Sequence, residues 1–442
     1  MSLFDPGNNT LSGLLITALL FLLPQSLFAG IEINCNSNFV VPHPTQLVID
    51  ISPTGTDDTV NIKCALDEAV EQGIPVVRLA KGDFAISNLQ IVNFKGSLQG
   101  TTRADTHLTI MDNSIDCAAF VNESRRTAAI IFVGGEPRLK FMTIISGQPC
   151  IQETKILSIV HFTGASRADL SCKNDVIFAV VDRVDLIGPE RSGTFTQAAI
   201  EASAEGWSSS GSCKNTLLGT FKLNQSSITG YDIGVLSTMR ASAQVDFNFN
   251  AFVNTYRGIW LVDSNQSTTI TGNTFTSENN NEDLNGIGAI EIGTRTNTAP
   301  VKTRVVVHNN QFTFSDAVGV SSNFFRGAAI TSNFSGNLQD VSLSITDNRF
   351  QLSGDNRFII HLRDIDNAVV SANKFAGGVA TGVSIAGAKA TTVSGCLIVS
   401  NILNTLTSEH QDIFLDEKTT HCIVGPAQDA DVVDLGVDNS IL

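Results

Sequence analysis

The sequence is poor in charged residues and in polar aromatic side chains. Charged residues make up 16% of the 442 residues, against about 25% in an ordinary soluble protein. Only 2 Trp and 2 Tyr accompany 26 Phe, so the aromatic residues mostly fill a dry interior and leave few rings to stack on sugars. The net charge of −15, without any cluster of Lys or Arg, disfavours binding to nucleic acid, because the phosphate backbone requires a basic surface.

Several motifs of catalytic and metal sites are also missing. The chain contains no Cys-x-x-Cys spacing, which argues against a zinc site. The nucleophile-elbow, Walker and zinc-protease patterns are absent as well. We therefore expect no cofactor, with calcium as the one metal for which the sequence offers ligands.

The N-terminal segment predicts export. An apolar run from Leu14 to Leu23 precedes Pro24 and a cleavage point after Ala29, and this run is too short to span a bilayer. We interpret residues 1–29 as a secretory signal peptide and expect a mature protein that is secreted, periplasmic or on the cell surface, and not in the membrane. The alternative is an apolar tail that belongs to the fold, because the segment before the run has no Lys or Arg.

The cysteines predict disulfides. All eight follow the proposed cleavage point, and an even number behind an export signal is typical of oxidised pairs. Many connectivities are open, and pairing between sequence neighbours is the simplest of them. It gives the pairs Cys35–Cys64, Cys117–Cys150, Cys172–Cys213 and Cys396–Cys422.

A recurring Asn-x-Phe signature is the strongest positive signal in the sequence. Short alternating apolar runs flank most copies, so the repeated unit is strand, tight turn, strand. A unit this short cannot bury its own apolar face and must stack on its neighbours, which predicts a solenoid. The copies are Asn250 and Phe252, Asn273 and Phe275, Asn310 and Phe312, Asn348 and Phe350, and Asn373 and Phe375, with a weaker one at Asn401 and Leu403.

The two residue types of the signature have separate roles in this interpretation. Asn occupies the turn because it tolerates left-handed backbone geometry, and stacked Asn side chains can hydrogen-bond from one coil to the next. Phe points inward and stacks in the same direction. The longest gaps between copies need loops that leave the coil, and the polar segments 277–286 and 332–340 are the candidates.

One amphipathic helix is expected before the first strands. Asp57 and Asp58 stand at the N-cap position, and apolar residues follow at helical spacing until Gly73. This helix would cover the open end of the solenoid, where unpaired strands invite edge pairing.

The beginning of the chain resembles a known family. The segments GTDDT, NIKCALDEAVEQG and KGDFAI, with the SLQG turn and the Asn-x-Phe coils, are similar to pectate-lyase-like right-handed parallel β-helix proteins. The resemblance covers residues 50–405 and implies an all-β, right-handed parallel β-helix (solenoid) with a short N-terminal capping helix. Since this superfamily includes lyases, hydrolases, epimerases and adhesive proteins, the resemblance is specific for fold and not for chemistry.

Three segments follow from this interpretation. The signal peptide at 1–29 precedes a β-helix at 30–404 of roughly a dozen coils. Residues 405–442 lose the repeat, turn acidic and are expected to form a C-terminal cap or tail. The family resemblance implies polysaccharide or a cell-surface glycan as partner, and the sequence gives no indication of the oligomeric state.

Aligned strands place polar residues in one outward column. If Ile259, Ile290, Ile360 and Val383 point inward, then Trp260, Glu291, His361 and Ser384 point outward. Arg363 lies beside His361 on the same face. One coil between Glu291 and His361 stays ambiguous, because either residues 317–321 or residues 327–331 could fill it.

This column carries the candidate site. We assign catalytic roles to Glu291, His361 and Arg363, because an acid, an imidazole and a guanidinium on one face could act on a glycan. The alternative for Trp260, Glu291 and His361 is solvated decoration of an outer strand.

Three neighbouring residues are candidates for substrate binding. These are Trp260, Tyr256 and Arg257, and the alternative for the last two is a Tyr that covers a coil edge beside an exposed Arg. Asp263, Asp364 and Asp366 could bind calcium, although turn chemistry explains Asp at these positions equally well.

Family signatures of catalysis are missing from the chain. We find no paired Asp with Gly-His-Gly as in polygalacturonases, no Asp-Pro-His motif as in alginate epimerases, and no clustered Asp set as in calcium-dependent pectate lyases. A polysaccharide lyase or other carbohydrate-active enzyme therefore ranks only slightly above a non-catalytic surface, adhesion or envelope-associated protein.

Overall fold

The structure is a computed structural model of the whole chain. It describes residues 34–112, 114–115, 127–147, 157–164, 176–189, 197–203, 218–238, 243–262, 267–277, 288–293, 303–314, 328–333, 341–352, 358–377, 382–387, 393–406, 412–426 and 431–442. The predicted signal peptide and most of the two predicted loops at 277–286 and 332–340 lie outside these residues, as do Cys117, Cys150, Cys172 and Cys213.

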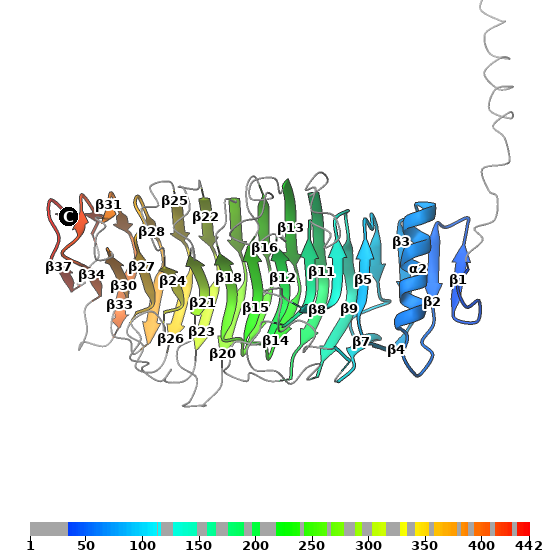
Figure 1. The fold of residues 1–442 in the computed structure, drawn as a ribbon. Coiled ribbons are helices and arrows are strands. Elements are labelled where there is room, and N and C mark those ends of the chain that lie inside the picture. Colours follow the sequence, from blue (N-terminus) through cyan, green and yellow to red (C-terminus); the bar gives the residue numbers. More distant parts are fainter. Residues whose placement is uncertain are drawn as a thin grey trace, which may run out of the picture.

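The described strands stack into a rod with one helix near its N-terminal end (Figure 1). One sheet has 24 strands and winds around two sides of the rod. Its strands are β1 (Val40–His43), β2 (Val48–Ile51), β3 (Val76–Leu79), β4 (Gly82–Ile86), β6 (Ser97–Gln99), β7 (Thr106–Ile110), β9 (Arg138–Ser146), β11 (Val176–Ile187), β13 (Leu218–Asn224), β14 (Ser227–Thr229), β16 (Gln244–Asn248), β17 (Ala251–Val253), β19 (Ser267–Thr271), β20 (Thr274–Ser277), β22 (Thr303–His308), β23 (Gln311–Phe314), β25 (Val341–Thr346), β26 (Arg349–Leu352), β28 (Val369–Ser371), β29 (Lys374–Gly377), β32 (Leu397–Val399), β33 (Ile402–Leu406), β36 (Ile423–Val424) and β38 (Ser440–Ile441).

A second sheet of 12 strands forms the remaining side. Its strands are β5 (Leu89–Val92), β8 (Thr127–Val133), β10 (Leu157–Thr163), β12 (Gln197–Ser203), β15 (Ile233–Thr238), β18 (Arg257–Val262), β21 (Gly288–Gly293), β24 (Ile330–Asn333), β27 (Ile360–Arg363), β30 (Val383–Ala386), β34 (Ile413–Leu415) and β37 (Val432–Asp434). A short pair, β31 (Val393–Ser394) and β35 (Thr419–Thr420), completes the described strands.

The pairing defines the architecture. Each strand of the 12-stranded sheet pairs in parallel with the equivalent strand of the next coil, as β18 does with β21 and β21 with β24. The described strands of the 24-stranded sheet also pair in parallel, except for the antiparallel hairpin β1–β2. The chain is thus a right-handed parallel β-helix, as the resemblance implied, since parallel crossovers are right-handed.

A left-handed residue bends each coil, and it is the residue before the Asn of the signature. Phe249, Gly272 and Asn309 have φ values of 57°, 67° and 54°, and each precedes a signature Asn. The prediction that the signature Asn itself takes the left-handed geometry is therefore wrong. The reason is that its side chain is needed inside the rod and not at the outer corner.

The signature Asn side chains form a continuous buried ladder, as expected. Asn273 Nδ2 donates to Asn310 Oδ1 at 3.0 Å, and Asn310 Nδ2 donates to Asn348 Oδ1 at 3.0 Å. The Asn310 amide also donates to the Ile270 carbonyl at 2.8 Å, and its oxygen accepts from the Asn273 backbone N–H at 2.9 Å. Each rung therefore satisfies backbone groups at the bend that water cannot reach.

Phe side chains stack beside that ladder in the core, which confirms the second half of the prediction. The ring centroids of Phe275 and Phe312 lie 4.9 Å apart with an interplanar angle of 4°. A second, looser stack was not predicted, because no fixed motif marks it in the sequence. It consists of Phe94, Phe132, Phe162, Phe221 and Phe247.

The helix α2 (Thr59–Gln72) confirms the predicted capping helix at the N-terminal end of the rod (Figure 1). Asp58 is its N-cap, and Gly73 ends it with a left-handed φ of 67°. Ile62 and Leu66 are buried against the core, whereas Val60, which fitted the helical spacing, is 76% exposed.

The sheets continue to the C-terminal end of the described chain. β34 and β37 extend the 12-stranded sheet, and β36 and β38 extend the larger one. Residues after 404 therefore add further coils to the stack.

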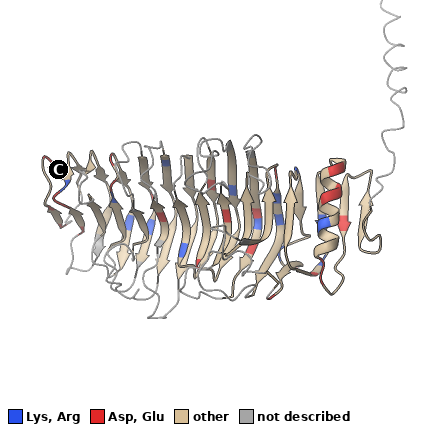
Figure 2. Ribbon diagram, viewed as in Figure 1, with Lys and Arg blue, Asp and Glu red and all other residues tan. Residues whose placement is uncertain are grey.

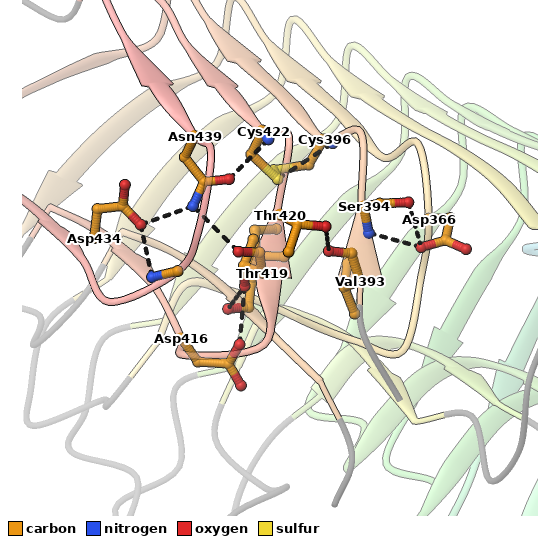
Figure 3. Close-up of a disulfide and its surroundings, with 12 residues drawn as sticks. Asp366, Val393, Ser394, Cys396, Asp416, Thr419, Thr420, Cys422, Asp434 and Asn439 are labelled. Atoms are coloured by element: carbon orange, nitrogen blue, oxygen red, sulfur yellow. Dashed lines mark hydrogen bonds between the residues drawn. A yellow bond between two sulfur atoms is a disulfide. The ribbon is translucent and has the colours of Figure 1, made fainter. Parts of the chain in front are cut away.

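Two of the four predicted disulfides involve described residues, and both are present. Cys35–Cys64 ties the N-terminal lead-in to α2. Cys396–Cys422 joins two of the last coils, and its surroundings are held by Asn439, whose Oδ1 accepts from the Cys422 backbone N–H at 2.9 Å (Figure 3). The disulfides predicted between the other four cysteines remain predictions.

Candidate functional site

The predicted column exists in the register of the 12-stranded sheet. Trp260 pairs with Glu291, Glu291 with Thr331, Thr331 with His361, and His361 with Ser384. The ambiguous coil is therefore filled by the segment that ends at Thr331. The residues predicted to point inward are all buried in the main core: Ile259, Ile290, Ile360 and Val383.

The column lies on the outer side of the sheet, yet most of its side chains are buried. Trp260 is 7% exposed and His361 is 8% exposed. Trp260 joins a second, smaller apolar cluster on this side, with Ala198, Ile233, Leu236 and Val262. The alternative of solvated decoration is thus wrong for Trp260 and His361, because a solvated side chain would remain exposed.

Arg257, Trp260 and Glu291 form one group on strands β18 and β21. Arg257 Nε lies 2.5 Å from Glu291 Oε2, and the Arg257 guanidinium lies 4.2 Å from the centroid of the Trp260 ring. One face of the indole is therefore covered by a cation and cannot also stack on a sugar. Tyr256 is buried and lies 5.8 Å from the same guanidinium.

His361 lies two strands beyond Glu291, so their backbones are about 9.6 Å apart at roughly 4.8 Å per strand. Its Nδ1 is 3.2 Å from Ser384 Oγ, and its ring stacks on Phe358 with centroids 4.6 Å apart. Burial lowers the pKa of His361 to about 4, and the positive charge of Arg363 adds to this effect. The imidazole is therefore neutral at pH 7 and is a weaker base than an ordinary His.

Arg363 is on the same strand face as His361 and near the acidic Asp364. Arg363 Nε is 3.7 Å from Asp364 Oδ2, and the Asp364 side chain is buried. Of the six predicted site residues, the structure brings Arg257, Trp260 and Glu291 into contact, with Tyr256 beside them. His361 and Arg363 form a separate group further along the rod.

The described residues do not place Asp364 or Asp366 in a metal-ligand cluster. Asp366 Oδ1 accepts from the Ser394 backbone N–H at 2.7 Å, which is the turn role that the sequence allowed (Figure 3). Asp263 lies outside the described chain. The single group of three candidate ligands within 4.8 Å in the described part of the chain is Cys35, Cys64 and Glu68, and its cysteines form a disulfide.

Sequence reasoning missed the part of this column nearer the N-terminus. Glu201 pairs with His161 on one side and with Leu236 on the other. Leu236 in turn pairs with Trp260. His161 Nε2 lies 2.6 Å from Ser203 Oγ and 4.0 Å from Glu201 Oε1. These coils precede the first Asn-x-Phe copy, so the motif could not align them. The alternation of polar and apolar residues in LSIVHFT and QAAIEAS was the one available signal.

Ser158 completes this buried polar group. Its hydroxyl donates to Glu201 Oε2 at 2.7 Å, and both side chains are buried. The column therefore carries an acid and an imidazole in one group at Glu201 and His161, whereas Glu291 and His361 further along belong to separate groups. Figure 2 shows that charged residues are otherwise sparse along the described strands.

No helix in the described part of the chain is long and apolar enough to cross a membrane. No protein-family model matches the sequence, and no curated protein matches it.

Solved structures are similar to the chain at low sequence identity. A surface adhesin of Streptococcus pneumoniae, PfbA, is 15% identical with a TM-score of 0.44, over 84% of this chain and 89% of the adhesin. The A-module of a mannuronan C-5 epimerase of Azotobacter vinelandii is 11% identical with a TM-score of 0.36, over 88% and 94%. The Dettilon tailspike protein is 14% identical with a TM-score of 0.47, over 90% and 68%. These likenesses concern the fold alone.

Proposed function

We propose that this chain is an exported β-helix protein that binds polysaccharide along the outer side of its 12-stranded sheet and acts on it by a lyase-like step. The observation that carries the proposal is the column itself. Polar and charged side chains of equivalent strands are in register along the rod, with coils roughly 4.8 Å apart, so an extended polymer lying along the axis would follow them. The disulfides at both ends of the rod support export to an oxidising compartment.

The lyase-like step is proposed at His361 and Arg363. Arg363 would neutralise the carboxylate of a uronate, and the neutral His361 would take the proton beside that carboxylate. The bond to the leaving oxygen then breaks as a carbon–carbon double bond forms, and the leaving oxygen takes the proton from the imidazolium. Because Nδ1 faces Ser384, Nε2 is the nitrogen for the substrate.

Glu291 is proposed to serve the neighbouring part of the polymer. Its backbone lies about 9.6 Å from that of His361, too far for both side chains to act on one bond without a large movement. With Arg257 and Trp260 it would hold a sugar ring beside the reacting one. An acidic polysaccharide fits best, because guanidinium groups recognise carboxylates.

This function can be tested by ultraviolet absorbance, which detects unsaturated uronates released from a glycan. The assay uses a panel of acidic glycans, each with and without calcium. We expect release from at least one glycan. His361→Ala and Arg363→Ala should each lower the rate on the order of 10²-fold, the first through loss of the proton acceptor and the second through loss of the charge that neutralises the carboxylate. Arg349→Ala, an exposed Arg on β26 of the other sheet, is the matched control and should leave the rate unchanged.

A non-catalytic binding protein is the second candidate. The mutual engagement of Arg257, Trp260 and Glu291 favours it, because these groups already satisfy one another. Retention on a glycan without release of unsaturated product would support this candidate. Full activity in both the His361 and the Arg363 variant would remove the proposed catalytic assignment and leave binding intact.

A further inference from the structure

A line of side chains, exposed except for the half-buried Phe141, runs along the outer corner of the 24-stranded sheet, on a different sheet from the column. Phe141, Arg183, Gln225 and Phe249 occupy the same bend in four successive coils, because the strands on both sides of each bend pair in register. We call these four residues the corner line. Their φ values are 56°, 55°, 48° and 57°, so all four are left-handed.

The residue types of the corner line are unfavourable for this backbone. Three later coils place Gly272, Asn309 and Asp347 at the same bend, which are the types that tolerate left-handed geometry. Phe and Arg do not, and bulky residues with positive φ are true outliers. Strain of this kind is retained mainly where the side chain has a function.

The corner-line side chains contact one another. The Arg183 guanidinium lies 5.3 Å from the centroid of the Phe141 ring, and Arg183 Nε donates to Gln225 Oε1 at 2.9 Å. The Phe249 ring lies over Gly272, where a Cβ atom would come within 2.7 Å of it. A side chain on Gly272 would therefore displace that ring.

Among the corner-line residues, Phe249 differs most from the usual buried position of Phe in this chain. Nearly all the largest fully buried side chains are Phe, yet Phe249 is 64% exposed. Its Cδ1 and Cε1 atoms lie against Gly272, and most of the residue is open to solvent. The ring is thus held in a fixed position without being part of the core.

We propose that the corner line is a second polysaccharide-binding surface, on which sugar rings stack on Phe141 and Phe249 while Arg183 and Gln225 hydrogen-bond to hydroxyl or carboxylate groups. The two rings are three coils apart, about 14 Å at roughly 4.8 Å per strand, so one extended chain could reach both. Aromatic rings take the apolar face of a sugar, and a few polar groups fix its orientation. This inference rests on the proposed function for the class of ligand, but it concerns a different surface.

Other occupants fit less well. A stable protein interface needs on the order of 1,000 Å², whereas the corner line is one side chain wide. Nucleic acid is disfavoured by the net charge of −15. A single polymer chain matches the narrow, linear shape.

Two measurements test the corner line. The first is retention of the protein on immobilised alginate, polygalacturonate, xylan and cellulose, and the second is its thermal unfolding. Phe249→Asn should weaken binding at least tenfold while leaving the unfolding temperature unchanged or higher, because Asn relieves the backbone strain. Arg183→Gln should weaken binding as well. Ala372→Asn is the matched control, since Ala372 has a φ of 56° at the same bend in a later coil, and it should not change binding.

The outcomes separate the two proposals. If Phe249→Asn and Arg183→Gln bind as the wild type does, while Trp260→Ala weakens binding, the corner line is not a binding surface and the proposed function stands. If the two corner variants alone lose binding, the corner line is supported. No retention of the wild type on any of the four matrices would overturn both proposals.

Discussion

His361 shows how strongly the surroundings of one side chain can alter its chemistry. It is buried between Phe358 and Ser384, and its pKa lies near 4 because burial and then Arg363 disfavour the charged form, with Asp416 acting weakly in the opposite direction. In the unfolded chain the pKa of His is about 6.5. Between these two values the unfolded chain binds a proton that the folded protein does not.

The free energy of unfolding should therefore fall as the pH drops from about 6.5 towards 4. His361→Gln removes this titrating group while keeping a polar side chain. Urea unfolding at pH 7 and pH 4.5 should show that the wild type loses about 2 to 3 kcal/mol more than the variant over this interval. An equal loss in both proteins would show that His361 is protonated as easily in the folded state as in the unfolded one.

The helix α2 is attached to the coils by one buried carboxylate. Asp58 Oδ1 accepts from the Thr54 backbone N–H at 2.8 Å, and Oδ2 accepts from the Ala85 backbone N–H at 3.1 Å. Asp58 is fully buried, and its own N–H donates to the Ala85 carbonyl at 2.7 Å. The side chain thus joins the lead-in, the start of α2 and strand β4.

Asp58→Ala should lower the free energy of unfolding by about 2 to 4 kcal/mol, because two partly buried backbone N–H groups lose a buried acceptor. Asp57→Ala is the matched control. Its exposed carboxylate accepts from the Thr59 backbone N–H at 2.9 Å, so it should cost only about 1 kcal/mol, as a helix cap does. Chemical denaturation measures both, and equal costs would show that Asp58 acts only as a cap.

Packing between successive coils depends on two glycines of the 12-stranded sheet. A Cβ on Gly234 would lie 2.9 Å from the Phe252 ring, and a Cβ on Gly258 would lie 2.8 Å from the Phe275 ring. These glycines leave space for the stacked rings of the adjoining sheet. The stacked Phe rings and the glycine positions of the 12-stranded sheet are therefore complementary in shape.

The whole molecule is a linear stack, so each coil contacts only its neighbours and the two ends are its weak points. The described disulfides are located there, Cys35–Cys64 near the first coils and Cys396–Cys422 in the last ones. They restrict fraying at the ends, where strands have a neighbour on one side only.

Hydrogen exchange with and without a reductant tests this role. We expect faster exchange after reduction in residues 34–79 and 393–442, because loss of the cross-link lets the end coils open. Residues 243–377 contain no cysteine and serve as the internal control, with unchanged exchange. Uniform acceleration along the rod would show that the disulfides stabilise the stack as a whole.

The sequence by itself determined the solenoid, the ladders of Asn and Phe, the capping helix and the register of Trp260, Glu291, His361 and Ser384. These features follow from local periodicity, since residues at one position of a repeat must come into line when coils stack. The same periodicity predicts which residues point inward and fill the core, among them Ile259 and Ile290.

Tertiary structure alone decided how the column is arranged. Spacing in the sequence does not reveal that Arg257 would cover Trp260 and pair with Glu291, because the contact depends on which side chains lean across neighbouring strands. Nor does it reveal that burial lowers the pKa of His361 to about 4. Burial and charge pairing depend on everything packed around a group, and residues from distant parts of the chain meet there only after folding.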